Sequence, residues 1–280
     1  MNSIAKVDIL VCTINEGIVE VPSLLMPPID NVCYVVSMQY TEDRFLELIP
    51  EVLTKRNDVV LSTIEGRGLS ANRNNAISCS KADICIIADD DVRYTKEGIQ
   101  NVVDMYNSSD ADVIIMQSLG PDGKLLRNYP PNSFNMSKPP RFYYPISFEI
   151  TFRRKSVENI LFDTRFGLGS KYMAAGEEDI WIHSLVLAGK QVVYHPTPFV
   201  KTLEYPKSGN LIYKDSRKLF TSGAVSYSIY GWTAYLRCFK YAVINAFKGN
   251  SSFLFMLKNM YNGIRYIKHS NQHKDESTKE

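Results

Sequence analysis

The segment Ile84-Cys85-Ile86-Ile87-Ala88-Asp89-Asp90-Asp91 decides how the rest of the chain is interpreted. Its apolar half, 84–88, predicts a strand buried on both faces, as in a parallel sheet. The three acidic residues then stand at the carboxyl end of the strand, the edge where open α/β sheets bind ligands. Neighbouring carboxylates repel one another, so such a cluster faces water or a cation.

Oxygen ligands of this kind suit Mg²⁺ or Mn²⁺ carrying a diphosphate. The alternative is an acidic turn that is simply hydrated. We favour the metal site, because the acids follow a buried strand directly.

Apolar runs alternate with helical patterns through the first part of the chain. This alternation predicts a doubly wound α/β sheet. The expected strands are 7–13, 32–37, 59–64, 84–88 and 112–117, and the expected helices are 44–55, 70–80 with Ser70 as its N-cap, and 96–107.

The middle of the chain has a different composition. Residues 120–145 are rich in Pro, Asn, Ser and Lys, which predicts a long loop. Such a loop is a lid, a segment facing the acceptor, or a variable surface excursion. Beyond it we expect a strand at 148–153, a helix at 178–188 and a strand at 192–195 ended by Pro196.

The C-terminal segments 222–247 and 253–267 combine aromatic residues with Lys and Arg. They predict amphipathic helices with basic faces, typical of helices lying on an anionic membrane. The alternative is packing against the catalytic domain or a second subunit. The polar tail 268–280 is expected to be disordered. The predicted organisation is a catalytic domain at 1–210, a helical appendage at 211–267 that contacts the membrane, and the tail.

Composition excludes several classes of protein. The chain has 280 residues, 45% of them apolar and 22% charged, as in ordinary globular proteins. A net charge of +2 gives no sign of a nucleic-acid partner. Its five Cys form no CxxC pair, which favours free thiols in a reducing compartment. We find no signal-peptide pattern and no membrane-spanning run, so we expect a cytoplasmic protein, peripheral on the inner face of the membrane.

Several segments together resemble the inverting glycosyltransferases of family 2, which have the GT-A fold. The resemblance covers residues 7–200 and depends on the order and spacing of the motifs. The segments are Thr13-Ile14-Asn15, Gly68 to Ala76, Asp89-Asp90-Asp91, Phe166-Gly167-Leu168-Gly169, Gly176-Glu177-Glu178-Asp179, Gly189 and Tyr194-His195-Pro196.

The resemblance implies the reaction. A sugar passes with inversion from a nucleotide sugar, expected to be a UDP-sugar, to a hydroxyl of a saccharide or lipid-linked saccharide acceptor. Mn²⁺ or Mg²⁺ would be the cofactor. The expected setting is bacterial capsule, O-antigen or exopolysaccharide synthesis.

The resemblance also implies roles for individual residues. Asp89 would contact the ribose side of the nucleotide, and Asp91, with Asp89, would bind the metal. Asp90 would point the other way, as alternation in an extended segment requires, and we count it with the donor site. Arg73 would lie near the nucleotide or its phosphates. The uracil side would be built from Thr13, Asn15 and Glu16, with Ser37 and Gln39 ending the adjacent strand.

The general base is assigned by counting. In the family, a Glu-Asp pair precedes a helix-ending Gly by about eleven residues, and the count from Gly189 gives Glu178. Glu178 thus replaces the usual Asp, with Glu177 before it and Asp179 as the competing candidate. A carboxylate in this place would accept the proton of the acceptor hydroxyl.

Other features depart from the family or leave alternatives. Segment 199–204 lacks the later His that binds metal in many members, and we expect a structural role for His195 and a core position for Trp181. A non-catalytic GT-A scaffold that binds a nucleotide sugar is disfavoured by the acids at 89, 91 and 178. A sugar nucleotidyltransferase would need a Gly-rich loop after the first strand, where only Gly17 stands. A receiver domain would need an acidic pair there.

Overall fold

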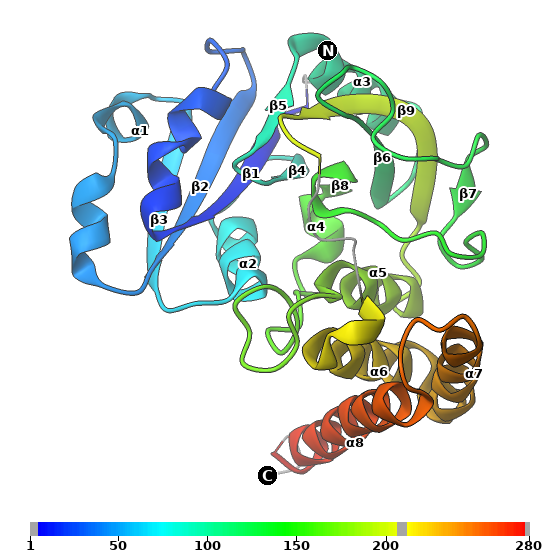
Figure 1. Ribbon diagram of the computed structural model, residues 1–280. Coiled ribbons are helices and arrows are strands. Elements are labelled where there is room, and N and C mark those ends of the chain that lie inside the picture. The colour runs from blue at the N-terminus through cyan, green and yellow to red at the C-terminus, as the bar shows by residue number, and fades with distance from the viewer. Residues whose placement is uncertain (1–4, 206–211, 278–280) are drawn as a thin grey trace. The chain divides into compact units, whose positions relative to one another are not determined.

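We describe the fold from a computed structural model, which describes residues 5–205 and 212–277, with side chains through residue 271. The chain divides into two compact units (Figure 1). The first comprises Met1–Phe162 and Trp181–Tyr205, and the second comprises Asp163–Ile180 and Pro206–Glu280.

The first unit is built on a mixed sheet with the strand order β3-β2-β1-β4-β8-β6-β9-β5, and β7 pairs with β9. Four parallel strands form one half, and β8 runs antiparallel to both β4 and β6. Strands β4 and β6 therefore point the same way, and their carboxyl ends lie at the same edge. The strands are β1 Val7–Ile14, β2 Val32–Tyr40, β3 Val59–Glu65, β4 Ile84–Ala88, β5 Val92–Tyr94, β6 Val113–Leu119, β7 Phe134–Asn135, β8 Ile150–Arg153 and β9 Val192–Thr202.

Strand alternation divides the core of this unit into two clusters. Ile9 and Val11 belong to one cluster, and Leu10 between them belongs to the other. Helix α3, Lys96–Asn107, packs on the first, while α2, Leu69–Cys79, packs on the second. Both faces of the sheet are covered, as predicted for a doubly wound fold. The short helices are η1 Asn15–Val19, η2 Val21–Leu24, η3 Asp43–Leu48, α1 Glu51–Lys55, η4 Ser147–Glu149 and α4 Arg154–Val157.

The predicted single helix at 44–55 is wrong. The structure has a 3-10 helix, η3, and a short α-helix, α1, with Pro50 at the N-cap of α1. Proline has no N–H to donate and its ring clashes with the preceding turn, so a continuous helix through residue 50 would be strained.

Two other local predictions also need correction, and one strand was not predicted. Helix α2 begins at Leu69, and its N-cap is Gly68, with a φ of 143°, in place of Ser70. Strand β9 continues past Pro196, and the β6–β9 register shifts on either side of Gln117. Such irregularities accommodate residues that cannot donate to a regular ladder. The three-residue strand β5 was too short for the pattern to reveal.

The second unit consists mainly of helices α6 Ser216–Tyr230, α7 Ala234–Phe247 and α8 Phe253–Ser277, with the short helices η6 Ile212–Lys214 and η7 Gly231–Thr233. Gly223 of α6 faces the Met260 carbonyl, and Gly263 of α8 faces the Phe220 carbonyl, with no room for a Cβ at either glycine. The two helix backbones therefore approach closely at these two residues. No helix among the described residues is long and apolar enough to cross a membrane.

The division of the chain differs from the boundary predicted at residue 210. Phe166, Met173 and Ile180 share a core cluster with Ala224 and Ile267, so the segment before α5 belongs with the C-terminal helices. Helix α8 runs through residue 277 and includes most of the tail predicted to be disordered, while residues 278–280 lie outside the described part.

Candidate active site

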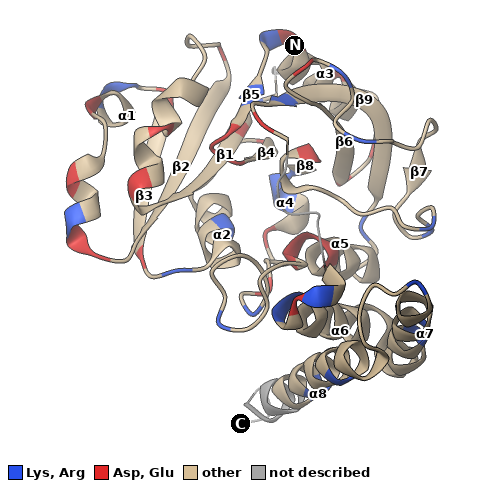
Figure 2. Cartoon of the chain, in the orientation of Figure 1, with Lys and Arg blue, Asp and Glu red and all other residues tan. Residues whose placement is uncertain are grey.

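The three acidic residues lie in a turn between β4 and β5 at the carboxyl edge of the sheet. Figure 2 colours the acidic residues red and shows this turn beside the end of β1. Strand β1 pairs with β4 in parallel, up to Val11 opposite Ala88. The chain that follows β1 therefore lies next to the acids, as the sequence predicted for this edge.

Asp89 is held from two directions. The Ser147 hydroxyl donates a hydrogen bond of 3.0 Å to its Oδ2, and Arg73 Nη2 lies 3.6 Å from its Oδ1. Arg73 is only 3% exposed, and its guanidinium lies over the Phe162 ring at 5.5 Å. A buried guanidinium on one carboxylate oxygen and a hydroxyl donor on the other fix the Asp89 side chain in place.

Asp90 points to a different neighbour. Its Oδ2 accepts a hydrogen bond of 3.1 Å from the hydroxyl of Thr13 at the end of β1. A Cβ on Gly17 would collide with that hydroxyl and lie 3.1 Å from the Asp90 carboxylate, so only glycine fits there. Burial, aided by the charges of Asp89 and Asp91, raises the pKa of Asp90.

Asp91 is the most exposed of the three. Partial burial, followed by the charge of Asp89, raises its pKa, and Glu204 adds to this. Neighbouring carboxylates repel one another when both are charged, and this repulsion raises their pKa. A bound cation would relieve the repulsion, and the carboxylate oxygens would be its ligands. The residues present therefore fit a divalent metal, although no group of three or more His, Cys, Asp or Glu in the described part of the chain is arranged to hold one.

The predicted donor residues on β2 are buried and hold α2 against the sheet. Ser37 donates a 2.5 Å hydrogen bond to Asn72, which in turn donates to the Thr13 carbonyl at 2.9 Å. Gln39 accepts a 3.0 Å hydrogen bond from the N–H of Gly68, at the start of α2. These contacts position Arg73, the next residue after Asn72. Asn72 itself was not predicted as a site residue.

The remaining residues predicted for the uracil side lie in η1. Asn15 has a φ of 52° and exchanges hydrogen bonds with Thr41, which follows β2. Asparagine tolerates this left-handed conformation better than most residues. Glu16 is exposed. The loops after β1 and β2 are thus tied to each other beside the acidic turn.

The predicted base candidates lie in the first turn of α5, Glu177–Leu187. Acidic side chains there are favourable because they face the positive end of the helix dipole. Glu178 and Asp179 are partly buried. Burial, with the neighbouring Glu178 charge, raises the pKa of Asp179 to about 7.

Trp181 is fully buried, which confirms its predicted core position. Its indole N–H donates a 2.6 Å hydrogen bond to the Ile160 carbonyl, and its ring stacks on Phe162 at 4.4 Å. Trp181 follows the acids in the sequence of α5, and its contacts with Ile160 and Phe162 lie within the first unit. Burial lowers the pKa of His183.

His195 contacts the Thr197 hydroxyl on its own strand at 3.0 Å, through Nδ1. This local contact agrees with the structural role expected for it. No residue of segment 199–204 offers an imidazole in its place.

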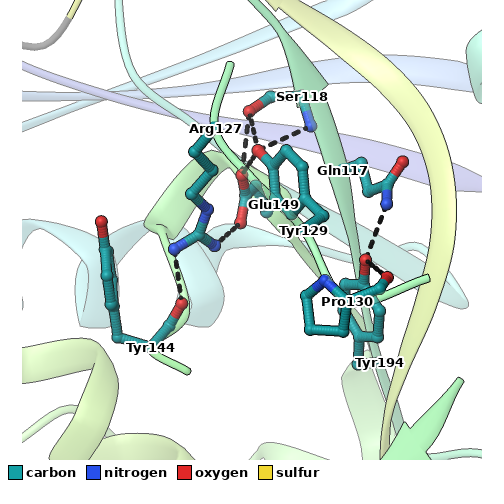
Figure 3. A network of polar contacts seen from close by, with 8 residues as sticks. All are labelled: Gln117, Ser118, Arg127, Tyr129, Pro130, Tyr144, Glu149 and Tyr194. Atoms are coloured by element: carbon teal, nitrogen blue, oxygen red, sulfur yellow. Dashed lines mark hydrogen bonds and ion pairs between the residues drawn. The ribbon is translucent and has the colours of Figure 1, made fainter. Parts of the chain in front are cut away.

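A buried acid that the sequence did not single out lies in η4, two residues after Ser147, the partner of Asp89. Glu149 is 0% exposed and forms a 2.7 Å ion pair with Arg127 (Figure 3). Tyr129 and Ser118 also donate hydrogen bonds to it. Burial raises the pKa of Glu149, and Arg127 opposes that rise. In the sequence, Glu149 could have been noticed as a single charged residue between the apolar residues Phe148 and Ile150.

The sequence profile described as Glycosyl transferase family 2 matches residues 23–173, which include the acidic turn. The chain belongs to glycosyltransferase family 2. The matched segment ends before Glu178, so it does not bear on the choice of base. No curated protein sequence matches the chain.

Solved structures share the fold of this family 2 enzyme. S. aureus TarS 1–349 superposes with a TM-score of 0.57 at 14% identity, covering 96% of this chain and 92% of that chain. The same protein in complex with UDP-GlcNAc gives 0.55 at 13% identity, with the same coverage. A longer TarS structure gives 0.52 at 15% identity, covering 88% of this chain and 43% of that one. The architecture is the GT-A fold that the sequence predicted.

Proposed function

We propose that this enzyme transfers a sugar from a UDP-sugar to a hydroxyl acceptor, with inversion, during synthesis of a surface polysaccharide. The observation that carries the proposal is the acidic turn, in which Asp89 is held by Arg73 and Ser147 while Asp90 is held by Thr13. A relative of the same fold is described in complex with UDP-GlcNAc, which supports a nucleotide-sugar donor.

In this proposal the chain's own residues divide the work. Arg73 and the loop after β1 orient the nucleotide, while Asp89 and Asp91 would hold Mn²⁺ or Mg²⁺. A bound divalent cation would stabilise the negative charge that develops on the departing nucleoside diphosphate. Glu178, or Asp179 in its place, would accept the proton of the attacking hydroxyl. A carboxyl with a pKa near 7 suits that task at neutral pH, which makes Asp179 a serious competitor.

A donor screen tests the proposal. Thermal shifts would be measured with UDP-, GDP-, CDP- and TDP-sugars, with and without Mn²⁺, followed by a release assay for the nucleoside diphosphate. We expect the largest shift with a UDP-sugar and Mn²⁺. Binding without release, under any acceptor tried, would favour the non-catalytic scaffold, and release of pyrophosphate from UTP and a sugar phosphate would favour a nucleotidyltransferase.

We also propose that the second unit contacts an anionic membrane through one face of α7. Leu236 and Phe247 are 62% and 90% exposed, and they lie on the same helix face as the exposed residues Phe239 and Lys240. Ala234, Cys238 and Ala242 lie on the opposite, buried face. An exposed apolar stripe with basic residues is typical of helices at the surface of an anionic bilayer, where the enzyme would meet a lipid-linked acceptor.

A further inference from the structure

The long loop between β6 and β8 encloses a pocket that no part of the proposed donor site uses. Its volume is about 370 Å³, and two short stretches, 127–130 and 140–144, supply its walls. The residues that matter for its chemistry are Arg127, Tyr129, Arg141, Phe142, Tyr143 and Tyr144. Four aromatic rings and two guanidinium groups thus surround a space large enough for a sugar ring.

One wall of the pocket is rigid. Arg127 donates hydrogen bonds to the Glu149 carboxylate at 2.7 Å and to the Tyr144 carbonyl at 2.9 Å (Figure 3). Its guanidinium also lies over the rings of Tyr129 and Tyr144, at 4.8 and 4.4 Å. The buried Glu149 neutralises Arg127, so this arginine shapes the wall without giving the pocket a net charge.

The rigid wall is linked to the donor side of the enzyme. Ser147 and Glu149 belong to the same short helix, η4, at the carboxyl edge of the sheet. Ser147 donates to Asp89 at one end of this helix, and Glu149 accepts from Arg127 at the other. The three residues of η4 therefore connect the acidic turn, through Ser147, with the pocket wall, through Glu149 and Arg127. The pocket thus lies beside the donor site.

The rim formed by residues 140–144 carries a strained and exposed aromatic residue. Phe142 has a φ of 67° and is 82% exposed. The other non-glycine residues with positive φ in the described part of the chain are Asn15 and Asn31, a residue type that tolerates this conformation. A bulky side chain held in this region, with its ring in water, is unfavourable both for the backbone and for solvation. A ligand that covers the ring would account for its position.

The charge on this rim belongs to Arg141. Its guanidinium lies over the Phe142 ring at 4.5 Å, and among the described residues no carboxylate forms an ion pair with it. An arginine stacked on an aromatic ring keeps its N–H groups available for a planar anion. The pocket therefore offers aromatic rings together with one positive charge that the protein does not neutralise.

We propose that this pocket is an acceptor subsite that binds an acidic sugar residue, with the apolar face of the sugar on Phe142 and Tyr144 and its acidic group on Arg141. The assignment rests on the proposed glycosyltransferase function, since it places the growing saccharide next to the donor. Sugar rings present C–H groups on one face, and aromatic side chains match that face while tolerating the hydroxyls around it. A neutral saccharide would leave the charge of Arg141 unused.

The test compares two tetrasaccharides of equal length, hyaluronan tetrasaccharide with two carboxylates and neutral chitotetraose, by isothermal titration. The hyaluronan tetrasaccharide is expected to bind more tightly. Arg141→Gln should weaken it by about tenfold, because a charge-assisted hydrogen bond is lost, and should leave chitotetraose unchanged. Phe142→Gly should weaken both by at least about threefold through the lost ring contact. UDP with Mn²⁺ is titrated into the same samples.

Two control variants match these changes. The control for Arg141 is Arg44, whose guanidinium also lies over a neighbouring ring, that of Phe45 at 4.7 Å. The control for Phe142 is Phe247, which is as exposed. Arg44→Gln and Phe247→Ala should therefore leave tetrasaccharide binding unchanged. Because glycine relaxes a positive φ, Phe142→Gly should not lower the melting temperature. A lower melting temperature would show that Phe142 holds the loop together and would overturn its assignment as a ligand contact.

The outcomes separate this proposal from the proposed function. Parent enzyme that binds UDP with Mn²⁺ but neither tetrasaccharide would overturn the subsite and leave the donor assignment standing. Tetrasaccharide binding that depends on Arg141 and Phe142, without any UDP binding, would support the subsite and overturn the UDP-sugar assignment. Equal binding of the two tetrasaccharides would overturn the preference for an acidic sugar.

Discussion

The hydroxyl of Ser147 donates a 3.0 Å hydrogen bond to the Asp89 carboxylate, although 58 residues separate them in the chain. Asp89 follows β4, and Ser147 begins the short helix that precedes β8, the strand antiparallel to β4. The sheet topology, not local sequence, brings the two together. Ser147 is buried, so its hydroxyl is a fixed partner for the acid.

Removing this partner should loosen Asp89 without unfolding the enzyme. Ser147→Ala is expected to weaken UDP binding in the presence of Mn²⁺ by roughly three- to tenfold, the range expected for one hydrogen bond to a partly hydrated charge. Isothermal titration measures the change. Ser78→Ala removes an exposed hydroxyl that bonds within its own helix, and it should bind UDP like the parent. Equal affinities for the Ser147 and Ser78 variants would show that Asp89 does not need this contact.

The metal dependence should reside in Asp91. Asp91→Asn keeps the size of the side chain but removes its charge, so Mn²⁺ should no longer increase UDP affinity, while the melting temperature stays close to that of the parent because the residue is exposed. Asp43→Asn changes an equally exposed acid in η3 and serves as the control. If the Asp91 variant still responds to Mn²⁺ like the parent, this residue is not a ligand.

The choice of base can be decided by two single variants. Glu178→Gln cannot accept a proton at neutral pH, and losing a general base costs about 10²–10⁴-fold in rate. Nucleotide release with an acceptor present should fall by that factor, while UDP binding is kept. Asp179→Asn should cost much less. The reverse pattern, an inactive Asp179 variant and an active Glu178 variant, would move the base to Asp179, as its raised pKa makes possible.

The sequence predicted the parallel half of the sheet well because long, continuous apolar runs have few alternatives. Strand β4 and helix α3 were predicted with the bounds that the structure shows. Strand β5 was missed because three residues are too few to show a periodic pattern. The helix predicted at 44–55 is divided at Pro50, although its apolar spacing continues across that residue.

The candidate site was only partly predictable for a related reason. Thr13, Arg73 and the acids at 89–91 stand in motifs, so their proximity followed from strand order. Ser147, Glu149 and Arg127 come from the irregular middle of the chain, where nothing in the sequence says which residues meet. Their contacts depend on β8 inserting between β4 and β6, a topology that periodicity does not specify.

The exposed face of α7 should determine membrane binding if the proposal for the second unit holds. Replacing Leu236 and Phe247 with Ser should reduce flotation with phosphatidylglycerol vesicles, and Lys240→Glu should reduce it further at low salt, since each basic residue near the surface contributes about 1 kcal/mol. Leu187→Ser, at an equally exposed position on α5, is the matched control. If none of the α7 variants changes vesicle binding, this face does not contact the membrane. If the variants lose dimers but keep vesicle binding, the face is a protein interface.

Asp179 should also leave a signature in the pH dependence of stability. Its pKa rises from the usual 3.8 to about 7 in the folded chain, so between these values the folded state holds a proton that the unfolded state has released. The contribution of Asp179 to stability therefore falls as pH rises from about 4 to 7 and then levels off, because at this residue the folded state binds more protons across that window. Asp179→Asn removes this loss.

The variant should match the parent near pH 4 and exceed it by a few kcal/mol at most at pH 8, measured by urea denaturation at several pH values. Glu178→Gln provides the internal control. This variant removes the Glu178 charge that contributes to the raised pKa of Asp179 but leaves Asp179 buried. The stability of the Glu178 variant should therefore stop falling at a lower pH than that of the parent. Parallel pH profiles for the parent and the Asp179 variant would show that Asp179 titrates normally, and the case for it as a competing base would then lose its electrostatic support.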